Sequence, residues 1–283
     1  MGFGNHFGHP KEASAARIST YTAWYLESSA EEMTTTTAAF FDLDKTLISR
    51  SSTLAFTRSF YRHGLISRSA VIRGAFAQAV FRRAGAGHGR MERIRSQVSE
   101  LCRGWQAERV REIVRKNLDE IIVPHLYAEA QALVSRHREA GQDVIIVSTS
   151  GHEVVDPIGA LLGADTVIAT QMVIADGYYT GDMAFYAYGE AKAARIRELA
   201  AERGYRLAEC YAYSDSITDL PMLEAVGYPT AVNPDRALRR VAAERGWPIL
   251  SFTAPSGRGR PRAAAPTGCG RLNHLFRACK RRH

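Results

Sequence analysis

The sequence has few cysteines and no long apolar run. Its four cysteines form no Cys-x-x-Cys pair and show no metal-ligand spacing, so they predict reduced thiols rather than a metal site. No stretch approaches the roughly eighteen uninterrupted apolar residues of a membrane span, and the start of the chain lacks the apolar core of a secretory signal. Together these absences predict a cytoplasmic protein.

Acidic residues are missing from the end of the chain, and this explains the formal net charge of +8. From Ser251 onward there are eight Lys or Arg and no acid, so the rest of the chain is balanced. The body therefore gives no reason to expect specific nucleic-acid binding. Residues 253–283 are rich in Gly, Pro, Ala and Arg, and we expect a disordered basic tail. A weak contact of this tail with RNA or anionic lipid stays open as an alternative.

The 283 residues, 46% of them hydrophobic, are enough to bury a sizeable core. Residues 1–32 show neither a helical nor a strand period, and Met33 stands just ahead of the first predicted strand. We expect residues 1–32 to be either a disordered extension or a mis-annotated one, in which case translation begins at Met33. The predicted folded unit is residues 33–252.

The most informative stretch is AAFFDLDKTL, residues 38–47. Its apolar start predicts a buried parallel strand that delivers Asp42 to its C-terminal edge, with Asp44 close behind. Open α/β sheets bind their ligands at this edge. Two carboxylates held close together repel one another unless a cation or a shared proton intervenes, so a hard ion such as Mg²⁺ is indicated.

Three later stretches also place polar side chains at the ends of apolar runs or at the starts of helices. DVIIVSTSG, residues 143–151, ends in hydroxyl groups, and the N–H groups of Thr149, Ser150 and Gly151 at a helix start predict a phosphate cradle. Lys192 falls in the first turn of a helix, where a cation opposes the helix dipole, which favours an assigned role for it.

The third stretch is YAYSDSITDL, residues 211–220, in which Asp215 follows a predicted strand and Asp219 begins a helix. Between the first two motifs, residues 53–128 lack strand alternation and predict an inserted helical domain. Its helices are predicted over residues 53–63, 67–83, 90–103 and 107–123, and another helix follows over 126–140. Downstream, strand and helix alternate, with a hairpin over 171–183 turning at Asp176 and Gly177 and strands over 207–213, 229–232 and 248–252. The predicted fold class is α/β, a doubly wound (Rossmann-like) parallel sheet with an inserted all-helical cap.

In order, these motifs resemble the four motifs of the haloacid dehalogenase superfamily over residues 35–252, and the helical insert resembles the cap of its phosphoserine-phosphatase-like branch. The resemblance implies a phosphomonoester hydrolase in which Asp42 is the nucleophile and forms an aspartyl-phosphate. It implies that Asp44 is the general acid and base, while Ser148 and Lys192 bind the phosphoryl oxygens. Whether Ser148 or Ser150 makes the phosphoryl contact stays open.

The same resemblance implies that Mg²⁺ is held by Asp42, the main-chain carbonyl of Asp44 and Asp215, with Asp219 in the first or second coordination shell. The substrate would be a small phosphorylated metabolite. Phosphoserine phosphatases have a substrate-binding glutamate nine residues after the nucleophile, whereas this chain has Ser51 there. A hydroxyl cannot neutralise the ammonium group of phosphoserine, which speaks against that substrate.

An alternative is a non-enzymatic phosphate sensor or receiver, in which the same aspartate is phosphorylated but turnover is slow. A receiver shares an acid cluster and a lysine with this pattern. Asp44 speaks against it, because a receiver has no need of an acid two residues after its phosphoacceptor.

Overall fold

The computed structural model describes residues 37–67 and 96–253 of the chain. Seven strands form one sheet in the order β4-β3-β2-β1-β5-β6-β7. Neighbouring strands pair in parallel except β3 and β4, which are antiparallel. The strands are β1 (Ala38–Asp42), β2 (Asp143–Gly151), β3 (Thr166–Ala175), β4 (Tyr178–Phe185), β5 (Tyr211–Ser214), β6 (Tyr228–Val232) and β7 (Ile249–Leu250).

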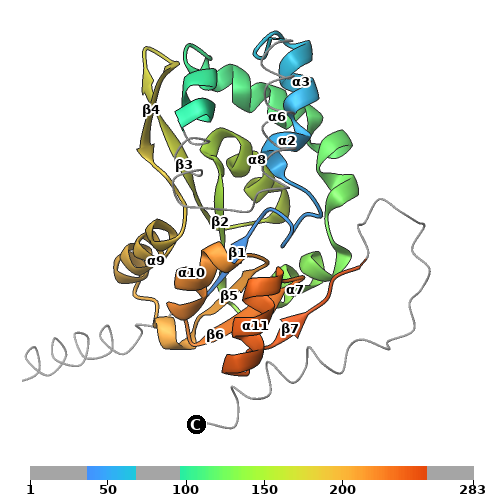
Figure 1. Cartoon of the computed structure of the whole chain (residues 1–283), viewed down its shortest axis with the longest axis vertical. Coiled ribbons are helices and arrows are strands. Elements are labelled where there is room, and N and C mark those ends of the chain that lie inside the picture. Colours follow the sequence, from blue (N-terminus) through green and yellow to red (C-terminus); the bar gives the residue numbers. More distant parts are fainter. Residues whose placement is uncertain (1–36, 68–95, 254–283) are drawn as a thin grey trace, which may run out of the picture.

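Helices cover both faces of this sheet (Figure 1). One face is covered by α7 (Ala128–Glu139) and α8 (His152–Leu162), with α6 (Ala107–Ile121) packed on α8, and the other face is covered by α9 (Glu190–Arg203), α10 (Leu220–Glu224) and α11 (Arg236–Arg245). From β1 the chain moves outward to β2 and β3, then returns to β5 on the other side of β1. This reversal of direction confirms the predicted doubly wound sheet and places the switch point of the topology beside β1.

The central strand β1 is buried on both sides, as its run of apolar residues predicts. Ala39 and Phe41 pack in the cluster below α6, α7 and α8, whereas Ala38 and Phe40 pack in the cluster below α9, α10 and α11. Because side chains alternate along a strand, Asp42 continues the second set. Its carboxylate is thereby directed to the side of the sheet on which α9 lies.

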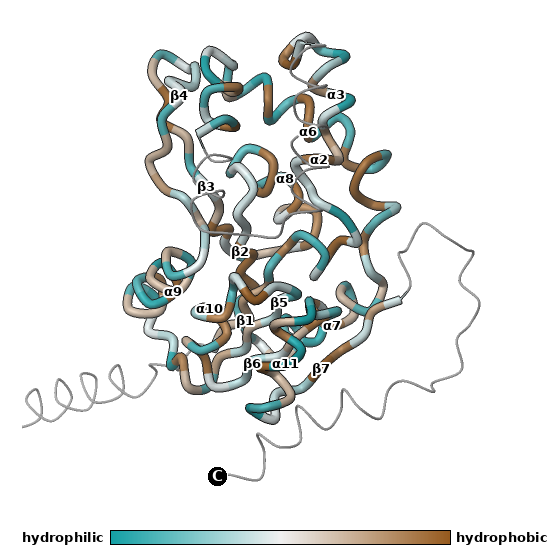
Figure 2. Tube along the Cα trace, viewed as in Figure 1, coloured by the Kyte–Doolittle hydropathy of each residue, from teal (hydrophilic) through white to brown (hydrophobic). Residues whose placement is uncertain are grey.

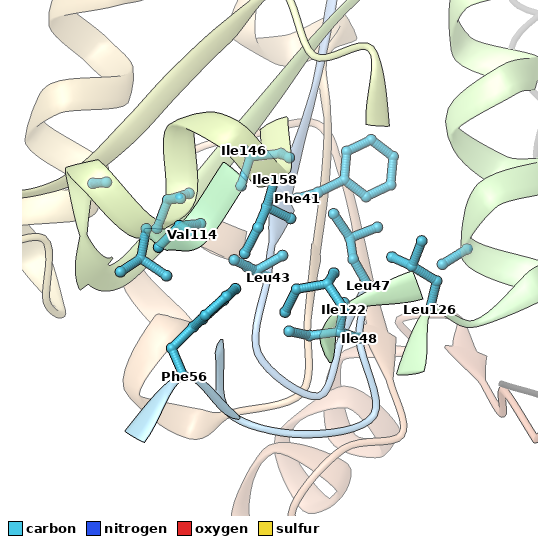
Figure 3. Close-up of a cluster of buried hydrophobic side chains, with 14 of the residues drawn as sticks. Phe41, Leu43, Leu47, Ile48, Phe56, Val114, Ile122, Leu126, Ile146 and Ile158 are labelled. Atoms are coloured by element: carbon cyan, nitrogen blue, oxygen red, sulfur yellow. The ribbon is translucent and has the colours of Figure 1, made fainter. Parts of the chain in front are cut away.

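The first of these clusters also fixes the loop after β1. Leu43, Leu47 and Ile48 are almost fully buried and pack with Phe41 and Phe56 from either side of the loop (Figure 3). Hydrophobic residues are likewise concentrated along the central strands in Figure 2. Burial of several large aliphatic side chains, each contributing about 2 kcal/mol, holds the backbone around Asp44 in one conformation.

Between β1 and β2, the elements within 43–67 and 96–142 are all helical. They are α2 (Ser52–Ala55), α3 (Thr57–Arg62), residues 96–102, α6, the short 3₁₀ helix η1 (Val123–His125) and α7. Most of residues 67–83, and the first part of 90–103, lie outside the described residues.

Several predicted boundaries were wrong. The helix predicted over 53–63 is broken at Phe56, which ends α2 and precedes α3. The strand predicted over 207–213 begins with a 3₁₀ helix, η2 (Leu207–Glu209), because Cys210 N–H bonds back to Leu207. The helix predicted over 126–140 starts at Ala128, since Leu126 instead bridges to Ile48. The predicted hairpin is confirmed, but β3 starts earlier, at Thr166, and joins the central sheet.

The β3–β4 hairpin reaches from the sheet to the helical insert (Figure 1). Gly104 and Ala107 donate backbone hydrogen bonds to Tyr179 and Gly177, and Tyr179 donates to Trp105. Arg111 of α6 pairs with the buried Glu153 of α8, with 3.3 Å between Nη2 and Oε1. The insert is therefore fixed to the core at two places away from its connecting segments.

Within the described ranges, no helix has both the length and the apolar character required to cross a bilayer. Cys102 and Cys210 are free thiols, as predicted.

A buried histidine supports the central strands. His137 of α7 is fully buried, its Nε2 lies 2.8 Å from Tyr213 Oη, and its ring meets Phe41 edge to face. Burial lowers the pKa of His137 from 6.5 to about 4, although a hydrogen bond with Gln142 acts in the opposite direction. The fold therefore requires the neutral imidazole.

We expect the free energy of unfolding to fall by about 3 kcal/mol through His137 as pH drops from 6.5 to 4. In that window the unfolded state binds a proton that the folded state does not. Chemical denaturation across the window, compared with His137→Gln, measures the contribution. The variant should be less stable at neutral pH and show a shallower pH dependence. Equal slopes for both proteins would contradict this prediction.

Candidate active site

The predicted site residues meet at one edge of the sheet because β1, β2 and β5 run parallel. Asp42 pairs with Val147, the residue before Ser148. Phe41 pairs with Tyr213, so Asp42 and Ser214 end their strands at the same level. The carboxyl ends of three central strands thus bring residues about 100 and 170 positions apart into one place.

A buried lysine joins two carboxylates at this edge. Lys192 Nζ lies 2.9 Å from Asp42 Oδ1 and 2.9 Å from both oxygens of Asp219. Its side chain is only 1% exposed. Asp219 also accepts a hydrogen bond of 2.7 Å from Ser214 Oγ, and Asp42 Oδ2 accepts one of 3.2 Å from Thr46 Oγ1. Each oxygen of Asp42 therefore has one described donor.

Lys192 occupies this place because α9 begins close to the sheet edge. Gly189 precedes the helix at φ +55° and ψ −126°, a conformation that a residue with a Cβ rarely adopts. The first turn then places Lys192 below Asp42 rather than in solvent. As the sequence indicated, Lys192 lies at the N-terminal end of its helix, where the helix dipole disfavours a cation. The carboxylates of Asp42 and Asp219 compensate for this unfavourable interaction.

Burial and charge shift the pKa values of this cluster in opposing directions. Burial acts to lower the pKa of Lys192, but Asp219 and Asp42 outweigh it, so the pKa is raised and the lysine is charged. Burial raises the pKa of Asp42 well above its ordinary value, with Lys192 acting against the shift and Asp219 and Asp215 adding to it. The site as it stands has more negative charge than its buried cation balances.

Asp215 lies just beyond β5 and is buried. Burial raises its pKa to about 7, while Lys45 lowers it. Lys45 Nζ is 3.9 Å from Asp215 Oδ2, but its side chain is 68% exposed, so solvent screens the pair. Lys45 itself has a left-handed φ of +67°, which turns the chain directly after Asp44.

Asp44 has partners different from those of Asp42. Its Oδ1 accepts a 2.8 Å hydrogen bond from Ser52 N–H, at the first residue of α2, and its Oδ2 accepts a 3.3 Å bond from Ser150 Oγ. The carboxylate is half-buried. The arrangement thus separates the two predicted acids, one held by a lysine and the other by neutral donors.

The residues at the end of β2 differ in exposure and partners. Ser148 is buried, and its Oγ accepts a 3.2 Å bond from Ser150 N–H. Thr149 is exposed, with its hydroxyl donating to Ala187 O. Gly151 is the N-terminal cap of α8 in an extended conformation. These residues adjoin the helix start as predicted, but Ser150 N–H is already used by Ser148.

The oxygen donors at this edge of the sheet suit a divalent cation that keeps some of its own waters. Nowhere in the described chain do three His, Cys, Asp or Glu side chains converge as a complete metal site. Mg²⁺ keeps several waters and needs only one or two protein carboxylates, so a set that combines Asp42 and Asp215 with a main-chain carbonyl fits it. Burial raises the pKa values of Asp42 and Asp215, and the neighbouring carboxylate of Asp219 adds to the shift, so a further cation at this edge would stabilise both carboxylates.

Four hydroxyl residues of the site were not predicted, namely Thr46, Ser52, Thr53 and Ser214. The run of hydroxyl residues at 51–53 was visible in the sequence, but nothing there indicates that it folds back onto Ser150. Ser214 at the end of β5 and Asp42 at the end of β1 face the same side of the sheet. The alternation of side chains along β5 could therefore have predicted that Ser214 lies in the site.

The comparisons with known proteins agree with this geometry. The model of the haloacid dehalogenase-like hydrolase family matches residues 39–224. The chain is 62% identical over 220 residues to the inhibition of morphological differentiation protein of Streptomyces azureus, covering 77% of this chain and 79% of that one. It is 54% identical over 231 residues to a probable phosphatase of Mycobacterium tuberculosis, covering 82% and 80%. It is 34% identical over 220 residues to a histidinol-phosphatase of Neisseria meningitidis, covering 76% and 98%.

Solved structures share the fold. A protein of unknown function from Bordetella pertussis is 29% identical, with a TM-score of 0.68, covering 77% of this chain and 99% of that one. A phospho-aspartyl intermediate analogue of phosphoserine phosphatase, at 20% identity and a TM-score of 0.55, covers 79% and 96% and supports the fold alone. The family model spans well over half of the sequence and includes the ion network of Asp42, Lys192 and Asp219. The chain therefore belongs to the haloacid dehalogenase-like hydrolase family.

Proposed function

We propose that this protein is a Mg²⁺-dependent phosphomonoester hydrolase that acts through an aspartyl-phosphate on Asp42. The observation that carries the proposal is the contact of Lys192 with both Asp42 and Asp219 at the carboxyl edge of the sheet, at 2.9 Å each. Two relatives are also named as phosphatases, the one from Mycobacterium tuberculosis as a probable one. The protein would act in the cytoplasm on a small phosphorylated metabolite.

Asp42 is suited to attack phosphorus because its carboxylate is fixed from two sides. Thr46 and Lys192 bind its two oxygens, so its orientation costs no reorganisation during the reaction. An oxygen of Asp42 forms the new bond to phosphorus while the bond from phosphorus to the leaving oxygen breaks. Lys192 and Ser148 would then bind the non-bridging oxygens of the transferred group.

Asp44 supplies the proton that the leaving alkoxide requires. In the first step it donates this proton and becomes a carboxylate, and in the second step it accepts a proton from water that attacks the phosphoryl group on Asp42. Inorganic phosphate leaves and both carboxyl groups return to their starting states. The neutral partners of Asp44, Ser52 N–H and Ser150 Oγ, allow it to change its charge without breaking an ion pair.

We propose Asp42, the main-chain carbonyl of Asp44 and Asp215 as the protein ligands of Mg²⁺. The bound ion would neutralise charge on the phosphoryl group and lower the pKa of the carboxyls that it binds. Asp219, which is engaged with Lys192 and Ser214, we assign to the second shell, where it orients the lysine. This assignment uses every buried carboxylate of the cluster.

A receiver-like phosphate sensor is the competing function. It would need the Asp42, Lys192 and Asp215 cluster but no group held in place for proton transfer. Asp44 has a hydrogen-bond donor on each carboxylate oxygen, which favours turnover over slow sensing. A nucleic-acid contact through residues 253–283 would depend on a segment outside the described residues and does not bear on this site.

We expect Asp42→Asn to abolish hydrolysis of a generic phosphomonoester, because the amide is a poor nucleophile at phosphorus. Chelation of Mg²⁺ should abolish the activity of the unmodified chain, and adding Mg²⁺ back should restore it. Steady-state phosphate release measures both, with circular dichroism as the control that the variant is folded. Full activity in the variant, or a rate that is independent of Mg²⁺, would contradict the mechanism.

We expect phosphoserine not to be the best substrate, since Ser51, half-buried next to α2, brings no charge to bind an ammonium group. In a panel of sugar, glycerol, nucleoside, lysophospholipid and histidinol phosphates, at least one should exceed phosphoserine about tenfold in kcat/KM, about 1.4 kcal/mol in transition-state binding. If phosphoserine heads the panel and Ser51→Glu does not improve its turnover, Ser51 is not the recognition position.

We propose residues 33–252 as the catalytic unit, with residues 53–128 as its helical cap. A chain restricted to 33–252 should keep the kcat/KM of the full chain within about twofold, because Phe252 is the last of the described residues that packs in the core. Activity and thermal unfolding of the two chains provide the comparison. An insoluble or inactive short chain would show that a segment outside these bounds is needed for folding.

A further inference from the structure

Ser150 has a hydroxyl group whose hydrogen-bonding capacity is fully used. It accepts hydrogen bonds from Ser52 Oγ at 2.8 Å and from Thr53 Oγ1 at 2.9 Å, and it donates to Asp44 Oδ2 at 3.3 Å. A hydroxyl has one hydrogen to donate and two lone pairs to accept with, so no capacity remains. A phosphoryl oxygen could bind here only by displacing Asp44.

Ser148 is in a different situation. Its Oγ accepts from Ser150 N–H and, among the described residues, donates to none. It ends the regular part of β2, one residue beyond the partner of Asp42. The hydroxyl hydrogen of Ser148 is therefore available to bind a phosphoryl oxygen, whereas the hydroxyl of Ser150 must have a different role.

That task involves the start of α2. Ser52 is fully buried, and it contacts Asp44 twice: its N–H binds Oδ1 directly, and its hydroxyl reaches Oδ2 through Ser150. Ser52, Ser150 and Asp44 thus form a closed ring of hydrogen bonds. Ser52 belongs to the helical segment after β1 and Ser150 to the end of β2, so the ring also ties these two segments together.

We propose that Ser150 and Ser52 are positioning residues that hold the carboxyl group of Asp44 where the leaving oxygen departs. The inference rests on the proposed function, since it assigns these two serines to the general acid of that reaction rather than to phosphate binding. Their bonds restrict the rotation of Asp44 about its side-chain torsions, and Thr53 fixes Ser150 from the solvent side. Loss of either hydroxyl weakens proton donation without touching the nucleophile.

This role affects substrates differently according to their leaving group. An alkoxide is a poor leaving group and needs the proton of Asp44 as it departs, whereas p-nitrophenolate leaves as a stable anion. The phosphoryl group is the same in both kinds of ester. A residue that binds phosphate affects both equally, but a residue that positions the acid affects chiefly the alkyl ester.

The test compares glycerol phosphate with p-nitrophenyl phosphate by kcat/KM, which reports the steps up to departure of the leaving group. General acid catalysis contributes about 10²- to 10⁴-fold, so partial misplacement of Asp44 in Ser150→Ala should lower the value for glycerol phosphate by about tenfold or more. The value for p-nitrophenyl phosphate should fall by less than about threefold. Ser52→Ala keeps the N–H contact and should give the same pattern with a smaller loss, while Ser150→Thr should restore most of the activity.

A double-mutant cycle separates positioning from independent effects. If Ser150 acts through Asp44, adding Ser150→Ala to Asp44→Asn should lower the glycerol phosphate value by less than about twofold further. Ser59→Ala is the matched control, because Ser59 is a buried serine of α3 outside the site, and both substrates should keep their values within about twofold.

Equal losses on both esters in Ser150→Ala would overturn the inference, because they would show contact with the phosphoryl group. Unchanged values on both esters would also overturn it, as would losses that add in the double variant. If the unmodified chain hydrolyses neither ester with Mg²⁺, the proposed function fails, and this inference with it. If the unmodified chain is active but the serine variants lose both esters equally, the further inference is wrong and the proposed function is unaffected.

Discussion

The site depends on one buried cation, Lys192, held between Asp42 and Asp219. Removing a lysine from water costs several kcal/mol, and its position at the start of α9 adds an unfavourable helix dipole. Two carboxylates at 2.9 Å offset these costs, and the charged state of Lys192 follows from them. Buried ion pairs of this kind add little to stability, so the arrangement is best understood through what it does at the sheet edge.

The rest of the fold holds these charged side chains in their positions relative to one another. Parallel pairing of β1 with β2 and β5 places Asp42, Ser148 and Ser214 at the same edge, and alternation along β1 turns Asp42 toward α9. On the opposite face, the apolar side chains around Leu43, Leu47 and Ile48 fix the loop that carries Asp44 (Figure 3). The two acids therefore leave the same strand but enter different environments, one ionic and one of neutral donors. That difference suits a nucleophile and a proton donor.

The sheet and the main acids could be predicted from the sequence because their signals are local. The apolar run before Asp42, the hydroxyls after Val147 and the alternation of strand and helix each follow from a few adjacent residues. The contacts between Ser52 and Ser150, 98 residues apart, have no local signal, since they depend on how the insert returns to the sheet. The break at Phe56 was missed because tertiary packing decides it, since Phe56 is fully buried in the core. The 3₁₀ turn at Leu207–Glu209 was missed because it rests on a backbone bond from Cys210 N–H, which no side-chain pattern indicates. The assignment of Ser150 likewise needed its partners, because a serine hydroxyl serves equally well as a phosphate ligand or as a bridge.

The most direct test of the account is to find where the phosphoryl group goes. The protein is mixed with Mg²⁺ and a turned-over phosphomonoester, quenched in acid within a single turnover, and digested, and the phosphorylated peptide is sequenced by mass spectrometry. The account predicts an acid-stable, base-labile acyl phosphate on Asp42, with Ser148 and Ser150 unmodified. Phosphate found on a serine, on Asp44 or on no residue during rapid turnover would contradict it.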